Sequence, residues 1–473
     1  MDVINNVYIN ALLADATYAL DETSGSELDQ EQLRVKLETR MSPTLAKYIS
    51  DNFTVVTHKE TSDVLGSGFD ATVWLDKSGK TYVSMTGSQP DGLFADFITD
   101  FDLTVSGSAG TQIVDMVNWW MKNTTAAGED AIQISRLPVP GFFSATLGFA
   151  TAPSVQGTGV LNSVTNMTVN GHSLGGHLAT AFTRLFGKKW PVDHTYTYNS
   201  AGFNGGSDRL LNQISAILGP NVGSEAFAGD DGQSNFYAEH GVSITTQNWF
   251  EGQQGKRVRL FNEFSVNRLD NHSMYKLSDA LSLGNLIATI DNSFDIDNMR
   301  ALFELGSNYT ASSLENVLDN LRKLFIGDTI TNTPTGDAGG SPDTRKTYHE
   351  HLHALKTELF ENPDNLALIL KPQYQNLHLV DTNILADSSH LNNANGFAYR
   401  YALENLNPFA ITGNVNLYSQ HNTDGKLNID KFSDQYLQDR AEMLAVKNQF
   451  FAEDIAEEQY NSRDGNRLFK DFS

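Results

Sequence analysis

The sequence predicts an α/β fold, in which a domain built on a parallel sheet is followed by a mostly α-helical C-terminal region. A β-prone run at residues 164–169 leads into a segment with apolar residues at helical spacing over 174–186, and a second β-prone run follows at 194–198. Strand, helix and strand in this order form a parallel βαβ unit. Repeated strand signals stop after Asp291, and helical patterns take their place.

Length and charge limit the possible organisation and partners. A chain of 473 residues is too long for one ordinary core. We therefore expect a domain at 1–291, with a helical N-terminal cover over about 1–52, and a mainly helical accessory region at 292–473. The formal net charge of −24 argues against a nucleic-acid partner and against simple attraction to anionic lipid.

Cysteine content and targeting signals limit the chemistry and the location. The chain has no cysteine, which excludes disulfide scaffolds, zinc ribbons and thiol nucleophiles. The N-terminus lacks the basic region and long apolar core of a Sec signal, and no run is apolar enough to span a bilayer. We expect the protein either to be secreted by a Sec-independent route or to stay in the cytoplasm.

The first domain is predicted to open with two helices and three strands. Helices are expected at 1–20 and 42–52, the second with Ser42 as its cap and Pro43 in its first turn. The three β-prone runs that follow lie at 53–57, 71–75 and 81–85.

Further elements complete this domain. The expected helices and strands lie at 112–121, 235–238, 257–261 and 277–290. Residues 204–233 are rich in glycine and are predicted to be a loop.

The second half is predicted to be helical. Its clearest helix spans 312–327, where Ser312 and Glu315 form a capping box and Gly327 ends an apolar stripe. Residues 328–345 are rich in Thr, Gly, Pro, Asp and Ser and predict a flexible linker or an exposed loop. Further helices are expected at 346–360, 397–406 and 433–456.

The run between the predicted strand and helix has the pattern of a nucleophile elbow, Gly171-x-Ser173-x-Gly175. In that device a strand turns sharply into a helix and exposes the serine hydroxyl at the edge of the sheet. The flanking glycines are needed because side chains there would collide with the turn. Ser173 is therefore the candidate nucleophile.

A serine nucleophile needs a base, and the base needs an orienting acid. His272 is the favoured base, because it follows the last predicted strand of the domain and lies after a candidate acid. Glu239 is the favoured acid, because it directly follows a strand candidate; Asp230 and Asp231 are the alternatives.

The turn after the third strand, Thr86-Gly87-Ser88, is a candidate for part of an oxyanion hole. A small polar residue beyond a glycine at a strand end is well placed for that purpose.

These motifs together resemble the class 3 (fungal-type) lipase family of α/β-hydrolases. The residues that carry the resemblance lie within about 50–290 and are 83–88, 96–100, Gly171 to Gly176 and His272. Residues 115–120 and 271–274 are most similar to the lipase-like domains of bacterial RTX-type secreted proteins. One position departs from the family, which usually has Arg where this chain has Thr86.

The resemblance implies an α/β-hydrolase domain that hydrolyses carboxylic esters of lipids, as a lipase or a phospholipase of the A1 type. Ser173 would be the nucleophile and His272 the base, and the backbone amides of Ser88 and Leu174 would form the oxyanion hole. The apolar, Gly- and Pro-rich stretch 137–149 would then be a lid that contacts a lipid interface, although a buried connection explains it equally well. No cofactor or metal is implied.

Two other functions compete with this reading. His349-Glu350-x-x-His353 matches the zincin pattern on a predicted helix, in which two histidines bind zinc and the glutamate acts as base. A hydrolase-like shell could also serve as a non-catalytic binding or adhesion module. Structural calcium is not supported by a clear motif, because the loop at 422–428 lacks the twelfth-position Glu.

Overall fold

The computed structural model describes residues 3–21, 28–61, 67–87, 101–137, 148–202, 205–220, 222–223, 232–239, 254–263, 265, 268–306, 313–341, 343–381, 388–414 and 416–456. The strands are β1 (Phe53–Glu60), β2 (Asp70–Asp76), β3 (Thr81–Met85), β4 (Asp130–Leu137), β5 (Gly148–Gln156), β6 (Met167–His172), β7 (Val192–Tyr198), β8 (Gln233–Ala238), β9 (Lys256–Leu260), β10 (His378–Asp381) and β11 (Phe409–Thr412). The α-helices are α1 (Val3–Thr17), α2 (Gln30–Leu37), α3 (Pro43–Asn52), α5 (Phe101–Thr124), α6 (Leu174–Phe186), α7 (Gly205–Leu218), α8 (Arg268–His272), α9 (Met274–Ile290), α10 (Ile296–Gly306), α11 (Ser313–Ile326), α12 (Lys346–Leu359), α14 (Ala394–Asn405) and α15 (Asp434–Ala456).

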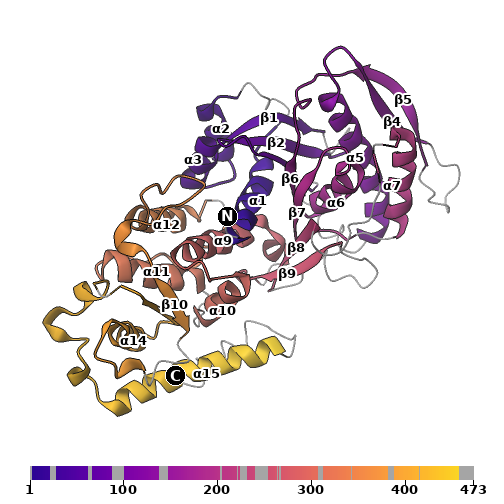
Figure 1. The fold of residues 1–473 in the computed structure, drawn as a ribbon. Coiled ribbons are helices and arrows are strands. Elements are labelled where there is room, and N and C mark those ends of the chain that lie inside the picture. The colour runs from indigo at the N-terminus through magenta and orange to yellow at the C-terminus, as the bar shows by residue number, and fades with distance from the viewer. Residues whose placement is uncertain are drawn as a thin grey trace.

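A mixed seven-stranded sheet, in the order β1-β2-β3-β6-β7-β8-β9, lies within residues 1–291 (Figure 1). β1, β2 and β3 form an antiparallel meander, and β3, β6, β7, β8 and β9 run parallel. The predicted βαβ unit is β6, α6 and β7, which confirms the α/β class. Because the carboxyl ends of parallel strands meet at one edge, the residues that follow these strands gather there.

Side chains alternate along the strands and supply two separate apolar layers. Val83 and Val169 belong to a cluster with α5, α6 and α7, whereas Tyr82 and Tyr198 belong to a cluster with α1 and α9. The second cluster continues into buried apolar residues of α11, α12 and α14. The helical half therefore shares a core with the α1 side of the sheet, as its place in Figure 1 also shows.

Helix α1 lies between the sheet and α9, and apart from Val3 and Asn6 its residues are buried. The predicted helix is thus confirmed, but it is enclosed on all sides rather than lying as a cover on the surface. The Tyr198 hydroxyl donates to the Val7 carbonyl (2.6 Å), and the Asn170 side chain donates to Asn10 Oδ1 (2.9 Å). These bonds fix α1 to β7 and β6.

A buried group of charges joins the helical half to α9 and α1. Arg345 Nε and Nη2 lie 3.0 and 2.5 Å from the two carboxylate oxygens of Asp279, and His349 Nε2 lies 2.9 Å from one of them. Arg345 Nη1 also lies 4.0 Å from the carboxylate of Asp15 in α1. Burial alone would raise the pKa of Asp279, but Arg345 and then His349 outweigh it and hold that pKa below its usual value.

The described part of 328–345 is a loop without helix or strand and is largely exposed, as one of the two predicted alternatives has it, but hydrogen bonds tie it to the core. The backbone amides of Gly336 and Ala338 both donate to the Glu315 carboxylate at 2.9 Å, and the amide of Gly339 donates to Asp279 at 2.8 Å. The polar turn residues of this segment therefore direct backbone donors onto buried carboxylates. Ser312, the other half of the predicted capping box, lies outside the described residues.

The prediction of a loop over 204–233 is wrong, because this segment contains α7. Leu211 and Ile214 of that helix are fully buried against α5 and α6, and its glycine-rich surroundings obscure their helical spacing. Strand β5 likewise lies in the stretch after 137 that has no clear strand pattern, and it pairs antiparallel with β4. Residues 138–147 of the predicted lid lie outside the described residues.

The remaining expected elements are confirmed within a few residues at their ends, except that α5 begins at Phe101 rather than near 112. Ser42 caps α3 with Pro43 in the first turn, as predicted. The helical half also contains one antiparallel pair, β10 and β11. Within the described ranges, no helix combines the length and the apolar character needed to cross a membrane.

We expect Arg345→Met to lower the free energy of unfolding by about 3 kcal/mol, because it leaves the Asp279 carboxylate buried without its main partner. The neighbouring cation offers a matched control. Lys346 is 60% exposed and pairs with Glu350 at 3.8 Å on the surface, so Lys346→Met should cost less than about 1 kcal/mol. Urea denaturation of the three proteins checks this, and equal midpoints for both variants would contradict it.

Candidate active site

Ser173 sits in the sharp turn between β6 and α6, as the elbow pattern predicts. Its backbone has φ 58° and ψ −126°, a conformation that non-glycine residues rarely adopt. The turn is held by the end of β7 and the residues after it, since the Ser173 amide donates to the Tyr198 carbonyl (3.0 Å) and the Ala201 amide donates to the Ser173 carbonyl (3.1 Å). The neighbouring chain thus fixes both backbone groups of the candidate nucleophile.

The glycines of the elbow are required by close backbone contacts. A Cβ atom on Gly171 would lie 2.2 Å from the carbonyl oxygen of Gly175, and one on Gly175 would lie 2.2 Å from that of Met85. A Cβ atom on Gly176 would lie 2.4 Å from Ser200 Oγ. The absence of side chains lets α6 approach β3 and the end of β7 closely enough to form the turn.

The amide of Leu174 and the turn after β3 lie beside the nucleophile. Leu174 is the first residue of α6, so its N–H has no acceptor within the helix and lies at the positive end of the helix dipole. A Cβ atom on Gly87 would lie 3.1 Å from the Leu174 nitrogen and 3.3 Å from Ser173 Oγ. Gly87 and Leu174 therefore border the space where an oxyanion could form. Ser88, the other predicted donor, lies outside the described residues.

His272, the predicted base, ends the short helix α8 and is buried close to the elbow. Its ring centre lies 4.9 Å from that of His172, the residue before the nucleophile. Its carbonyl accepts hydrogen bonds from His172 Nε2 (2.8 Å) and from the Asn199 side chain (3.0 Å). Burial, and then the neighbouring His172, lower the pKa of His272 to about 3, so its ring is neutral near pH 7.

The other histidines of the first domain that the structure describes are used elsewhere. His177 lies within α6 and bonds to the Gly202 carbonyl at 3.0 Å, and His194 lies on β7 and bonds to Ser234 at 2.9 Å. His58 lies on β1 and bonds to Thr72 at 2.9 Å, and His240 lies outside the described residues.

Glu239 follows β8 at the carboxyl edge of the sheet, as predicted, and its amide donates to the Leu260 carbonyl at 2.9 Å. Its buried carboxylate lies 3.4 Å from Arg300 Nε of α10, a partner that the sequence did not suggest. Asp230 and Asp231 lie outside the described residues.

Tyr18 also belongs to this region, and no sequence pattern predicted its place there. Its hydroxyl lies 2.9 Å from His172 Nδ1 and 3.0 Å from the amide nitrogen of Gly87. The residue lies just beyond α1, far from the elbow in the sequence, and only the burial of α1 beneath the sheet brings it there.

Thr86, the position at which the sequence departs from the lipase pattern it resembles, has its own partner in the structure. Its hydroxyl donates to Asp70 Oδ2 at 3.0 Å, across β3 and β2. A hydrogen bond from a hydroxyl to a carboxylate thus holds this end of β3.

The zincin-like histidines serve structural roles in this fold. His349 bonds through Nδ1 to Ser42 (2.7 Å) and through Nε2 to Asp279 (2.9 Å), so neither ring nitrogen is open to a metal. His353 bonds to Asp364 at 2.8 Å. Across the described ranges, no group of three or more His, Cys, Asp or Glu side chains could hold a metal ion.

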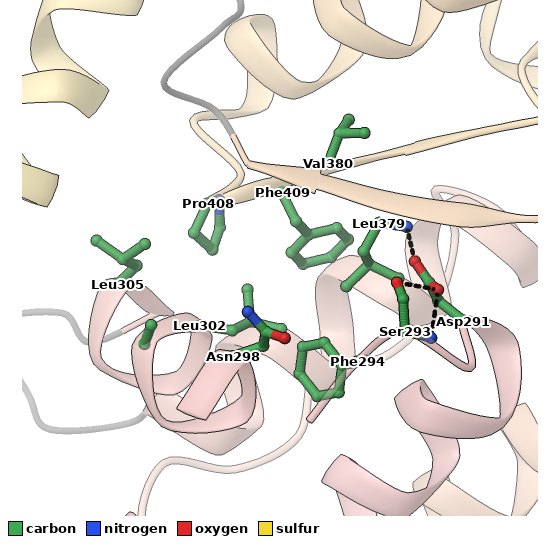
Figure 2. A pocket seen from close by; sticks show the side chains of 11 residues that line it. Asp291, Ser293, Phe294, Asn298, Leu302, Leu305, Leu379, Val380, Pro408 and Phe409 are labelled. Atoms are coloured by element: carbon green, nitrogen blue, oxygen red, sulfur yellow. Dashed lines mark hydrogen bonds between the residues drawn. The ribbon is translucent and has the colours of Figure 1, made fainter. Parts of the chain in front are cut away.

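A cavity of about 190 Å³ lies in the helical half, between α10 and the β10–β11 pair (Figure 2). Apolar side chains such as Leu302 and Phe409 line it. Its Asp291 carboxylate is already bonded to Ser293 and to the Leu379 amide (2.7 and 2.8 Å). The cavity includes no residue of the elbow, and its carboxylate acts as a local cap.

A search with protein-family models and a search of curated proteins each give no match to this chain. Among solved structures, a nonglycosylated form of the LIP2 lipase of Yarrowia lipolytica is 14% identical, with a TM-score of 0.32 over 54% of this chain and 79% of that chain. A 1.7 Å crystal structure of the same lipase is 11% identical, with a TM-score of 0.31 over 56% and 82%. The M37 lipase is 13% identical, with a TM-score of 0.27 over 62% and 96%. Likenesses of this size establish neither a family nor an activity, so the function rests on the geometry of the chain's own residues.

Gly175→Ala should destabilise the protein by about 3 kcal/mol, because its Cβ would meet the Met85 carbonyl at 2.2 Å and the backbone of two paired elements would have to separate. Gly79→Asn is the control, since Gly79 has φ 87° with open space around its Cα, and asparagine tolerates that conformation. Thermal melting of both variants measures the difference. A Gly175→Ala protein as stable as the control would show that the elbow is not packed as described.

Proposed function

We propose that the protein is a serine carboxylester hydrolase acting on lipids, as a lipase or a phospholipase of the A1 type. The observation that carries the proposal is the strained backbone of Ser173, held between the central parallel strand and the start of α6. A backbone strain of this kind costs about 1–3 kcal/mol and persists mainly where function uses it. Ser173 precedes Leu174, the first residue of α6, and the residue before it, His172, packs against the ring of His272 at 4.9 Å between ring centres.

The proposed mechanism uses His272 as base. Its ring accepts the Ser173 proton while the hydroxyl oxygen attacks the ester carbonyl, and the amides of Leu174 and Ser88 bind the oxyanion. His272 then returns the proton to the leaving alcohol, and an acyl-enzyme remains. Water, activated by the same histidine, hydrolyses that ester and releases the acid.

Glu239 is the proposed orienting acid, with Asp230 and Asp231 as alternatives. Its place at the end of β8 supports the role, because catalytic residues project from the carboxyl ends of parallel strands. Arg300 at 3.4 Å compensates the charge of this buried carboxylate. The same ion pair is also what a purely structural glutamate would have, so substitution must decide between the roles.

The lipid substrate and the route of secretion are further parts of the proposal. The apolar stretch 137–149 would act as a lid at a lipid interface. Leu137, which is the last residue of β4 and the first of this stretch, is 48% exposed. Membership of the class 3 lipase family, closest to the lipase-like domains of RTX-type proteins, would fit secretion by a Sec-independent route.

Ser173→Ala should abolish hydrolysis of a soluble p-nitrophenyl ester, of a triglyceride and of a phospholipid while leaving the melting temperature within a few degrees of wild type. Mass spectrometry of the products from the two lipids identifies the bond that is cut. A fluorophosphonate probe should label the wild type at Ser173 and leave the variant unlabelled. Retained activity in the variant would refute the proposal, and a wild type that neither reacts nor labels would favour the non-catalytic module. Activity lost with a chelator would instead favour zinc.

Glu239→Gln should lower kcat for the soluble ester by about 10³-fold or more, because an amide cannot stabilise the imidazolium that forms during the reaction. Asp230→Asn and Asp231→Asn should each stay within about tenfold of wild type. A loss confined to one of the aspartate variants would move the acid to that residue and leave Glu239 a structural role with Arg300.

A further inference from the structure

Tyr18 links three parts of the candidate site that are distant in the sequence. It follows α1, whose bonds to Tyr198 and Asn170 hold the helix against β7 and β6. Its hydroxyl contacts His172 in the elbow and Gly87 in the turn after β3. His172 in turn contacts the carbonyl of His272.

The directions of these hydrogen bonds follow from their partners. The His272 carbonyl can only accept, so His172 Nε2 carries the proton and donates at 2.8 Å. Burial lowers the pKa of His172 to about 4, against the opposing effect of that bond, so the ring is neutral and Nδ1 must accept. Tyr18 therefore donates to Nδ1 and accepts from the Gly87 amide, which can only donate.

Each bond in this series fixes a different part of the reaction centre. The bond to the His272 carbonyl sets the backbone from which the base projects. The bond from Gly87 to Tyr18 occupies the Gly87 amide, and it orients the turn that borders the nucleophile. Removal of the Tyr18 hydroxyl would leave His172 free to take its other tautomer, in which Nε2 no longer donates to His272.

A series of charged side chains connects the ring of Tyr18 to the helical half of the chain. The Arg40 guanidinium lies 4.5 Å from the centre of the ring, and Arg40 Nε bonds to Asp15 at 2.8 Å. Asp15 lies 4.0 Å from Arg345. A cation over the face of a buried aromatic ring restrains where its hydroxyl points.

We propose that Tyr18 and His172 act as a positioning pair, which holds the base His272 and the turn at Gly87 at a fixed separation around Ser173. The role rests on the proposed function, because it presupposes that Ser173 and His272 react. Neither side chain takes part in a proton transfer to substrate. Their effect is to keep the reacting groups within the narrow range of positions in which attack is fast.

Tyr18→Phe tests the pair, and Tyr418→Phe is a matched control. The Tyr418 hydroxyl also makes two bonds, as donor to the Ile411 carbonyl (2.6 Å) and as acceptor from the Ile411 amide (3.3 Å), but it is fully buried and lies in the helical half. Tyr418→Phe should therefore lose at least as much stability as Tyr18→Phe. Only Tyr18→Phe should impair turnover.

With a soluble p-nitrophenyl ester, we expect Tyr18→Phe to lower kcat about 10- to 100-fold with KM within about threefold of wild type. The double variant Tyr18→Phe/His172→Phe should lose little more than His172→Phe alone, because the two residues act as a unit. The rate of fluorophosphonate labelling should fall in parallel with kcat.

The positioning role is overturned if kcat of Tyr18→Phe stays within about twofold of wild type, if the loss lies in KM alone, or if Tyr418→Phe loses as much turnover. These outcomes require an active wild type that depends on Ser173. Absence of that activity would instead overturn the proposed function, and the positioning role with it.

Discussion

The left-handed backbone of Ser173 is the constraint on which the centre of the sheet depends. A conformation that costs about 1–3 kcal/mol persists only where surrounding structure over-determines it. Here Tyr198 at the end of β7 and Ala201 just beyond it bond to both backbone groups of Ser173, and the end of β3 contacts Gly175 so closely that no side chain fits between them. The order β3-β6-β7 thus places a strand on each side of the elbow, and both strands are needed to hold the turn.

A second requirement is that α1 be buried, because it carries Tyr18 to the elbow. A helix that is apolar on all sides must be enclosed, and the sheet covers only one side of it. Helix α9 covers another side, and the buried charges of Asp279, Arg345 and Asp15 attach the helical half to both helices. The helical half therefore completes the surroundings of α1. Its Arg345 lies near Asp15, Asp15 bonds to Arg40, and the Arg40 guanidinium lies over the ring of Tyr18.

Local patterns in the sequence were sufficient to predict most elements, and contacts over long distances were not. The elbow could be predicted because its glycines, strand and helix lie within about twenty neighbouring positions, and the structure has the predicted turn there. Helix α7 was missed because its flanking glycines obscured the spacing of Leu211 and Ile214. The position of Tyr18 and the pairing of Glu239 with Arg300 depend on how segments distant in the sequence pack together. A local sequence pattern cannot predict such packing. The positions of Ser88, Asp230 and Asp231 remain predictions.

The two motifs of this sequence that match catalytic patterns differ in how much of their geometry they specify. The glycine–serine pattern dictates its own backbone, because glycines are needed at these positions wherever such a turn is made. The histidine–glutamate pattern specifies only a spacing on a helix, and the same spacing serves whatever partners surround it. In this chain those partners are Ser42 and Asp279, which bind both nitrogens of His349. A motif that fixes backbone geometry is therefore stronger evidence of function than one that fixes only side-chain spacing.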